Sequence, residues 1–297
     1  MAKKSRKNTV KLWVEGARLR TLPLAIAPVA LGTATVLATT VPLKPALTFL
    51  ALAVALFLQI SVNYANDYSD GIRGSDANRV GPLRLTGSGS TKPQSVKFAA
   101  FLFFGLAALA GFAIVLLTQQ WWLIAVGLAC IVAAWFYTGG KSPYGYAGLG
   151  ELAVFVFFGL VATVGTSFIQ VGFLDQTAVL MGAAVGFFAS AVLMVNNIRD
   201  RENDAKVGKR TLAVKVGAKW SRVLFLVMLW LPFAIASLVA TIYPPAALAW
   251  LTVLLVGPAT VIFVMAKTPK ELILVLKLTS LAALVFSVLV LLGFSAQ

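Results

Sequence analysis

The feature that most constrains this chain is a series of nine apolar segments. Each is close to the roughly 20 mostly apolar residues that a helix needs to cross the hydrocarbon core of a bilayer. The segments are continuous rather than alternating in blocks of about ten, which favours transmembrane helices over strands. They cover residues 21–43, 46–65, 98–118, 121–138, 148–171, 177–198, 223–243, 246–266 and 272–294. The sequence therefore predicts an all-α bundle of nine transmembrane helices.

The composition excludes several other classes of protein. Apolar residues make up 60% of the chain and charged residues only 12%, about half the roughly 25% that is typical of a soluble domain. The single cysteine, Cys130, rules out a disulfide scaffold. Histidine is absent from the sequence, which removes His-ligated metals and Ser-His or Cys-His nucleophile pairs. Any chemistry must therefore use Asp, Asn, Lys, Arg and Tyr.

The basic residues predict the orientation of the bundle. When successive connections are assigned alternately to two sides, the N-terminal side holds 23 of the 25 Lys and Arg residues. Short loops on the cytoplasmic side of a membrane carry such an excess, so we expect a cytoplasmic N-terminus and a multi-pass protein of the cell membrane. The net charge of +15 favours contact with anionic membrane lipid. Nucleic acid is not expected as a partner, because the basic loops are short and hold no aromatic stacking platform.

The acidic residues are few, and most of them lie in two clusters. Six of the ten follow the second or the sixth apolar segment, on the predicted cytoplasmic side: Asp67, Asp70, Asp76, Asp200, Glu202 and Asp204. Asn66 and Asp70 are four residues apart, as are Asn196 and Asp200, so each pair shares one helix face. Aspartates and asparagines also cap helices and occupy turns, but two matching clusters favour a binding site.

These clusters predict a magnesium site. Hard oxygen ligands without His or Cys are typical of Mg²⁺, which binds through carboxylates together with substrate phosphates. The similarity of the clusters also suggests a duplication within a single domain over residues 1–297. Its halves would cover residues 18–140 and 148–266, with the ninth helix, 272–294, appended.

At these residues the sequence resembles the UbiA superfamily of intramembrane aromatic prenyltransferases. Its first motif has the form NDxxDxxxD, matched here by Asn66, Asp67 and Asp70. Gly74 stands at the position of the last aspartate of that motif, and Asp76 is the candidate to replace it. The second motif, DxxxD, is matched by Asp200 and Asp204. Further strings, such as NDYSDGIRGSD and NNIRDRENDAKVGKR, are similar to the branch of 1,4-dihydroxy-2-naphthoate polyprenyltransferases of menaquinone synthesis.

The resemblance implies an enzyme that joins a polyprenyl diphosphate to 1,4-dihydroxy-2-naphthoate with loss of CO₂ and diphosphate. Asp70, Asp200 and Asp204 are the expected catalytic residues. The expected Mg²⁺ ligands are Asn66, Asp67, Asp70, Asp76, Asp200 and Asp204. The expected diphosphate-binding residues are Arg18, Arg73, Arg84, Tyr137, Lys141, Lys206, Lys209 and Arg210. The expected acceptor-binding residues are Asn63, Glu151 and Asn197.

Other readings of the sequence remain open at this stage. A transporter or channel is the main alternative of a different class, but its pathway charges should lie near mid-membrane, whereas these carboxylates gather at one face. A membrane phosphotransferase would also use aspartates and Mg²⁺, but its Ala-Arg pair after the first Asp-Gly is missing from SDGIRGSD. Within the superfamily, haem, chlorophyll and ubiquinone branches offer other acceptors.

Overall fold

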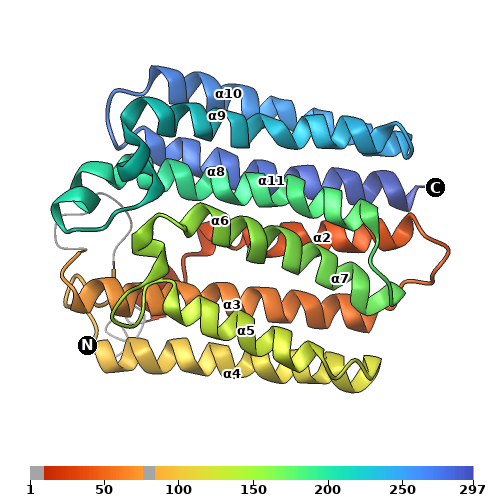
Figure 1. The fold of residues 1–297 in the computed structure, drawn as a ribbon, viewed down its shortest axis with the longest axis horizontal. Helices are drawn as coiled ribbons and strands as arrows, with labels where there is room; N and C mark the ends of the chain where they lie inside the picture. Colours follow the sequence, from red (N-terminus) through yellow and green to blue (C-terminus); the bar gives the residue numbers. More distant parts are fainter. Residues whose placement is uncertain (1–9, 76–83, 297) are drawn as a thin grey trace.

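The computed structural model describes residues 10–75 and 84–296, and these residues form helices and connecting turns without a strand. Figure 1 shows the longer helices lying side by side in one bundle. The α-helices are α2 (Pro23–Leu37), α3 (Pro45–Ile72), α4 (Pro93–Thr118), α5 (Leu123–Phe136), α6 (Gly150–Val154), α7 (Ala162–Val171), α8 (Gln176–Lys206), α9 (Leu212–Ala240), α10 (Val253–Met265) and α11 (Leu272–Ser295). The other helical segments are η1 (Leu19–Thr21), η2 (Tyr144–Ala147), η3 (Phe155–Val161) and η4 (Pro244–Thr252).

The prediction of an all-helical membrane protein is confirmed. Among the described residues, seven helical stretches are long and apolar enough to cross a membrane. An eighth is added if Val10–Thr21 and Pro23–Leu37, which meet at an angle of 46°, form one bent span. The segment predicted at 121–138 contains only the 14 residues of α5, which at about 1.5 Å per residue extend roughly 21 Å. Helix α5 ends here because the chain turns at Gly139 and Gly140, and Gly140 has a left-handed φ of 75°.

Two helices extend well beyond the apolar segments that predicted them. Helix α3 continues to Ile72 and α8 continues to Lys206, whereas hydropathy ends these segments at residues 65 and 198. Asp67 and Asp70 therefore lie on the last turns of α3, and Asp200, Glu202 and Asp204 lie on those of α8, where residues four apart share a face. These five acidic residues are parts of helices rather than of loops.

Among the described membrane-spanning helices, α8 is the most deeply buried. Phe188 of α8, Phe233 of α9 and Phe286 of α11 are buried against one another, with ring centroids 5.3 to 6.1 Å apart and edge-to-face geometry. Aromatic pairs of this geometry add stability beyond the area that they bury. This cluster fixes α8, and thus the second acidic cluster, relative to the last helices of the chain.

Glycines bring η3 against the other side of α8. A Cβ atom on Gly159 would lie 2.4 Å from Gly186 Cα and 2.7 Å from the carbonyl oxygen of Gly182. Small residues allow membrane helices to approach this closely. The segment at the contact, η3, is π-helical, a conformation that appears mostly as short interruptions of α-helices and often near functional sites.

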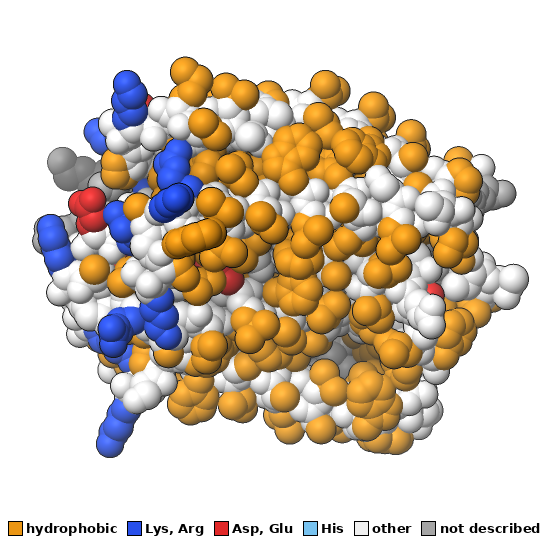
Figure 2. All heavy atoms as spheres, turned by 45° about the horizontal axis from the view of Figure 1, so that its top comes forward, with side chains coloured by type: hydrophobic (Ala, Val, Ile, Leu, Met, Phe, Trp, Pro, Cys, Tyr) orange, Lys and Arg blue, Asp and Glu red, His pale blue; other side chains and the backbone are white. Residues whose placement is uncertain are grey.

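Charge divides the surface of the molecule. In Figure 2 the Lys and Arg side chains gather at one end, and hydrophobic side chains cover most of the remaining visible surface. This is the end at which α3 and α8 finish, whereas α11 finishes at the opposite end. A long apolar surface next to a basic end is typical of a membrane protein with basic loops on one side.

Candidate active site

The first acidic cluster is centred on Asp70, in the last turns of α3. Its side chain is 5% exposed. Its Oδ1 accepts a hydrogen bond of 2.7 Å from the Tyr146 hydroxyl. Its Oδ2 lies 3.7 Å from Arg84 Nη2 and 4.0 Å from Lys209 Nζ. Buried charges of this kind are tolerated when they are paired and hydrogen-bonded, and here two cations from different parts of the chain balance the charge of Asp70.

Asn66, one turn before Asp70, is tied to the loop after α5. Its Oδ1 accepts a 2.7 Å hydrogen bond from the Thr138 hydroxyl. Arg73 donates hydrogen bonds to the carbonyl oxygens of Thr138 and Gly140. The end of α3 therefore positions this loop through three side-chain contacts.

The second cluster lies on α8 and contains a buried ion pair. Arg199 donates two hydrogen bonds, of 2.7 and 2.6 Å, to the two carboxylate oxygens of Asp200. The same guanidinium donates a 2.8 Å hydrogen bond to Asn196 Oδ1. Two-point pairing of arginine with a carboxylate fixes the orientation of both groups. Asp204, one turn further along α8, is also buried.

The two clusters meet where α3 and α8 end. Asn203 Nδ2 donates a 3.2 Å hydrogen bond to the carbonyl oxygen of Ser75, which links the end of α8 to the turn after α3. The ring of Tyr146 lies between the clusters, 5.3 Å from Arg73 Cζ and 5.0 Å from Lys209 Nζ. The Arg210 backbone N–H also donates to the Tyr146 carbonyl, at 2.9 Å. One tyrosine therefore contacts cations from both clusters.

The phenol of Tyr146 acts as a hydrogen-bond donor in this site. Burial, followed by the negative charge of Asp70, raises the pKa of Tyr146 above its ordinary value. The hydroxyl also lies 3.1 Å from the hydroxyl of Ser75. Tyr146 is therefore protonated at neutral pH, and its proton is directed at the Asp70 carboxylate.

Asp67 is placed differently from the other predicted magnesium ligands. Its side chain is fully buried, and its two oxygens accept 2.8 Å hydrogen bonds from the backbone N–H groups of Leu85 and Thr86. In this arrangement Asp67 holds the chain segment that carries Arg84 against α3. Asp76 lies outside the described residues.

The three predicted acceptor-binding residues do not form one group. Asn197 Nδ2 donates a 2.9 Å hydrogen bond to Glu151 Oε1, and both residues are buried. Glu151 Oε2 has no hydrogen-bond partner among the described residues. Asn63 lies instead on α3, where its Nδ2 donates to the Ala17 carbonyl oxygen at 2.9 Å. Of the three, only Asn63 lines the cavity described next.

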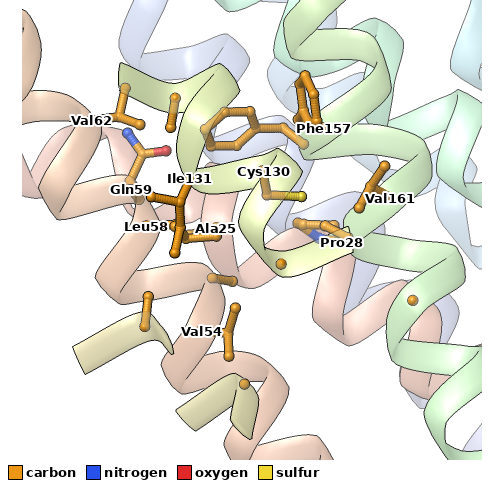
Figure 3. Close-up of a pocket in the computed structure, with 18 of the residues that line it drawn as sticks. Ala25, Pro28, Val54, Leu58, Gln59, Val62, Cys130, Ile131, Phe157 and Val161 are labelled. Atoms are coloured by element: carbon orange, nitrogen blue, oxygen red, sulfur yellow. The ribbon is translucent and has the colours of Figure 1, made fainter. Parts of the chain in front are cut away.

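A cavity of about 1090 Å³ opens beside the clusters. Figure 3 shows part of its wall, where apolar side chains of α2, α3, α5 and η3, such as Pro28, Val54, Cys130 and Phe157, surround the space. Its polar lining includes Arg18, Thr21, Gln59, Asn63, Asn66, Tyr137, Tyr144 and Asn196. Asn66 and Asn196 each precede a cluster aspartate by four residues, so the cavity reaches both clusters. A large, mostly apolar space with several polar groups in its wall suits an amphiphilic ligand.

The other predicted diphosphate-binding residues lie partly in the cavity wall and partly at the surface. Tyr137 and Arg18 line the cavity. Lys206, at the end of α8, and Lys141 and Arg210, in the loops, are exposed, so they add positive charge at the surface rather than within the cavity.

The donor set fits Mg²⁺. In the described residues no three His, Cys, Asp or Glu side chains form a closed metal cage. Mg²⁺ does not require one, because it keeps several waters and is held by one or two carboxylates together with substrate phosphates. The carboxylates of Asp70 and Asp200, with the amide oxygens of Asn66 and Asn196, are ligands of this type. Each carboxylate already lies beside a basic side chain, as expected where negative charge is concentrated for binding cations.

Two residues of the site do not stand out in the sequence. Tyr146 lies among glycines in YGYAGLG, and only its position on the predicted cytoplasmic side draws attention to it. In the sequence, Arg199 counts only as one of the basic residues that predict the orientation of the bundle, although it immediately precedes Asp200. A basic residue beside a buried acidic residue is a signal for internal pairing, because such a carboxylate needs a partner.

Comparison with known sequences shows what this chain is similar to. Residues 25–272 match the profile described as the UbiA prenyltransferase family. The chain is 47% identical over 292 residues to the 1,4-dihydroxy-2-naphthoate octaprenyltransferase of Mycobacterium tuberculosis, covering 94% of each chain. It is 44% identical over 287 residues to the protein of the same name from Mycobacterium leprae, again with 94% of each chain covered.

The fold is also similar to that of solved structures. A UbiA homolog from Archaeoglobus fulgidus bound to DMAPP and Mg²⁺ superposes with a TM-score of 0.67, covering 96% of this chain and 100% of that one. The two sequences are only 14% identical, so this similarity concerns the fold. An apo UbiA homolog from Aeropyrum pernix K1 gives a TM-score of 0.69 at 16% identity, covering 92% of this chain and 97% of that one.

Proposed function

This chain belongs to the UbiA prenyltransferase family, and from that membership we propose that it transfers an octaprenyl group from octaprenyl diphosphate to 1,4-dihydroxy-2-naphthoate. The observation that carries the proposal is the 47% identity, over nearly the whole chain, to a relative named for this reaction. The site is compatible with it, because Asn66 and Asn196, each one helical turn from a paired carboxylate, line a large apolar cavity. The products are CO₂, diphosphate and a demethylmenaquinone.

The diphosphate of the donor binds where α3 and α8 end. Arg84 and Lys209 lie beside the Asp70 carboxylate there, and Arg73 lies beside the ring of Tyr146, whose hydroxyl donates to Asp70. Asn66, Asp70, Asp200 and Asp204 are the residues that would hold Mg²⁺. Their oxygen donors fit this ion, and the archaeal homolog of the same fold binds it. Bound there, Mg²⁺ would neutralise negative charge on the leaving diphosphate.

The protein's own contribution is to favour separation of charge in the donor. The allylic carbon–oxygen bond breaks, and its electron pair leaves with the diphosphate. The cations around Asp70 are already oriented by hydrogen bonds and ring contacts, so they stabilise the growing charge without reorganising. The apolar cavity keeps water from the allylic cation.

The acceptor then attacks the cation with its ring. The carbon that carries the carboxylate forms the new carbon–carbon bond. The bond from that carbon to the carboxylate breaks, CO₂ leaves, and the electron pair of this bond restores the aromatic ring. No proton has to be removed from the ring carbon, which agrees with a site that has no histidine.

The test is an assay with purified protein, Mg²⁺ and octaprenyl diphosphate. We expect a prenylated naphthalene product with 1,4-dihydroxy-2-naphthoate and none with 4-hydroxybenzoate as the acceptor. A product with 4-hydroxybenzoate alone would assign the chain to another acceptor branch of the family. Transfer to neither acid would contradict the proposal.

Cys130 can report whether the octaprenyl chain occupies the cavity. It is the only cysteine of the chain, and its half-buried side chain lines the cavity wall. We expect an apolar maleimide to modify Cys130, and saturating octaprenyl diphosphate to slow the reaction about tenfold or more because it fills the space. Inorganic diphosphate, which has no chain, should not protect. If both compounds protected Cys130 equally, or if neither did, the octaprenyl group would bind outside this cavity.

The nine-helix topology and its orientation also belong to this proposal. The clustering of Lys and Arg at one end supports a cytoplasmic active site in the plasma membrane. Nine crossings from a cytoplasmic N-terminus place the C-terminus outside. Alkaline phosphatase fused after Gln297 should therefore be active and a fluorescent protein fused there dark, with the reverse pattern for fusions in the loop at Gly208. A cytoplasmic signal from the C-terminal fusion would contradict nine crossings.

A further inference from the structure

The loop that carries Tyr146 is bonded to the segment that follows α8. Tyr146 belongs to η2, in the connection between α5 and α6. Its carbonyl oxygen accepts a 2.9 Å hydrogen bond from the Arg210 backbone N–H. The next carbonyl oxygen, of Ala147, accepts a 2.6 Å hydrogen bond from Lys215 Nζ. The position of Tyr146 therefore depends on residues that come about 65 positions later in the chain.

Gly148 allows the Lys215 side chain to lie close to the loop. Gly148 has a φ of 77°, in the left-handed region that favours glycine. A Cβ atom at this position would lie 3.0 Å from Lys215 Cδ and 3.2 Å from the Arg210 carbonyl oxygen. The stem of the lysine therefore lies against the backbone of Gly148 while its ammonium group reaches the carbonyl oxygen of Ala147. These contacts join the loop and the start of α9 over three successive residues.

The hydroxyl of Tyr146 fixes one oxygen of the Asp70 carboxylate. It donates a 2.7 Å hydrogen bond to Oδ1, and the Ser75 hydroxyl lies 3.1 Å from the same phenol oxygen. The other carboxylate oxygen, Oδ2, lies beside Arg84 and Lys209. Both oxygens of Asp70 thus have partners from other parts of the chain, which gives the carboxylate one preferred orientation. Partners that hydrogen-bond a metal-binding carboxylate typically contribute about 10–100-fold to metal affinity or activity.

The ring of Tyr146 contacts two cations that come from different helices. Arg73 Cζ, just after α3, lies 5.3 Å from the ring centroid, and Lys209 Nζ, after α8, lies 5.0 Å from it. A cation at this distance over an aromatic face is attracted to it. Arg73 and Lys209 are both expected to bind the diphosphate. The ring therefore gives each of them a preferred position before the anion arrives.

We propose that Tyr146 is a positioning residue of the diphosphate site and that Lys215 holds Tyr146 in place. The hydroxyl fixes the orientation of the Asp70 carboxylate, an expected Mg²⁺ ligand, and the ring holds Arg73 and Lys209 ready for the phosphate oxygens. Lys215 acts through the loop alone. The inference rests on the proposed function, because it uses the diphosphate site where α3 and α8 end.

Binding of inorganic diphosphate to purified protein, measured by calorimetry over a range of Mg²⁺ concentrations, separates the two roles of Tyr146. Tyr146→Phe removes the hydroxyl and keeps the ring. We expect the Mg²⁺ concentration for half-maximal binding to rise about tenfold or more, with wild-type diphosphate affinity at saturating Mg²⁺. Tyr146→Leu also removes the ring, and should weaken diphosphate binding at saturating Mg²⁺ by about five- to thirtyfold.

The two variants can fail separately. An unchanged Mg²⁺ requirement in Tyr146→Phe would overturn the role of the hydroxyl, and equal diphosphate affinities of the Phe and Leu variants would overturn that of the ring. Tyr64→Phe is the control, because Tyr64 is also buried and donates a 2.8 Å hydrogen bond, to the carbonyl oxygen of Trp13, but does not line the cavity. Its Mg²⁺ requirement should equal that of wild type, and a rise like that of Tyr146→Phe would contradict the inference.

Lys215→Met tests the anchoring of the loop. It keeps an unbranched stem and removes the donor to Ala147, so the Mg²⁺ requirement should rise about two- to tenfold, the usual effect of one hydrogen bond. Lys215→Arg should recover part of this loss. Lys219→Met is the charge-matched control, since Lys219 is exposed four residues further along α9 and contacts the ring of Trp220. Equal effects of the two methionine variants would overturn the role of Lys215.

The double variant shows whether Lys215 acts through Tyr146. In Tyr146→Phe, the Lys215→Met substitution should raise the Mg²⁺ requirement no further, because the hydroxyl through which it acts is gone. Additive effects would contradict the inference. A wild type that binds diphosphate but transfers no octaprenyl group would contradict the proposed function instead, and the binding comparisons would still decide the roles of Tyr146 and Lys215.

Discussion

Asp70→Asn should lower octaprenyl transfer by about 10²–10³-fold or more, the usual cost of removing one preorganised group that stabilises transition-state charge. The substitution keeps the size of the side chain and its hydrogen bond with Tyr146, but it removes the negative charge that lies beside Arg84 and Lys209. Asp200→Asn should have a comparable effect on the second cluster. The measurement is kcat with saturating donor and acceptor, over a range of Mg²⁺ concentrations.

Asp175→Asn is a matched control for these variants. Asp175 precedes α8 at its opposite end, where its carboxylate accepts hydrogen bonds from the backbone N–H groups of Thr177 and Ala178. Asparagine also caps helices well, so this variant should retain both its fold and its transfer rate. Asp200→Asn also removes the carboxylate that pairs with Arg199. The thermal stability of this variant must therefore be measured together with its transfer rate. Near wild-type kcat in a folded Asp70→Asn variant would contradict the placement of the diphosphate.

Gly159→Ala should destabilise the folded bundle by about 1–3 kcal/mol, the range typical of overpacked interiors. The new methyl group would lie 2.4 Å from Gly186 Cα and 2.7 Å from the Gly182 carbonyl oxygen. These are backbone atoms, so relief requires η3 to move away from α8 as a whole. The effect should appear as a lower apparent melting temperature of the detergent-solubilised protein.

Gly257→Ala separates this packing effect from the general effect of replacing a helical glycine. In the described part of the chain, apart from its chain neighbours and the backbone of its own helix, no atom lies within 4 Å of a Cβ atom at Gly257, on α10. Alanine there should be neutral or stabilising by up to about 1 kcal/mol, because it lowers the entropy lost on forming a helix. Equal melting temperatures for the two alanine variants would show that the contact between η3 and α8 is looser than these distances indicate.

The helices could be predicted from hydropathy, but their ends could not. The predicted segments stop near the first polar residues, whereas α3 includes Asp67 and Asp70 and α8 includes Asp200 and Asp204. The mean hydropathy of a window of residues falls when a charged residue enters the window. The backbone hydrogen bonds of a helix nevertheless continue through that residue. Hydropathy also does not predict the bend between Val10–Thr21 and Pro23–Leu37. Proline is favoured in the first turn of a helix, and Pro23 begins α2 here.

The predicted site was incomplete for a related reason. Spacing within one helix predicted which carboxylates share a face, and the helical stretches confirm that arrangement. It could not predict that Asp67 turns toward Leu85 and Thr86, nor that the loop after α5 brings Tyr146 to Asp70. Those contacts join residues distant in the chain, and no local pattern encodes them.

The pairing of Arg199 with Asp200 has a consequence for how the protein is assembled. The two side chains belong to neighbouring residues on one helix, so their contact needs no other segment of the chain to be in place. An unmatched charge would oppose burial of this end of α8. A pair that is neutral as soon as the helical turn exists removes that obstacle before any other helix has packed against α8.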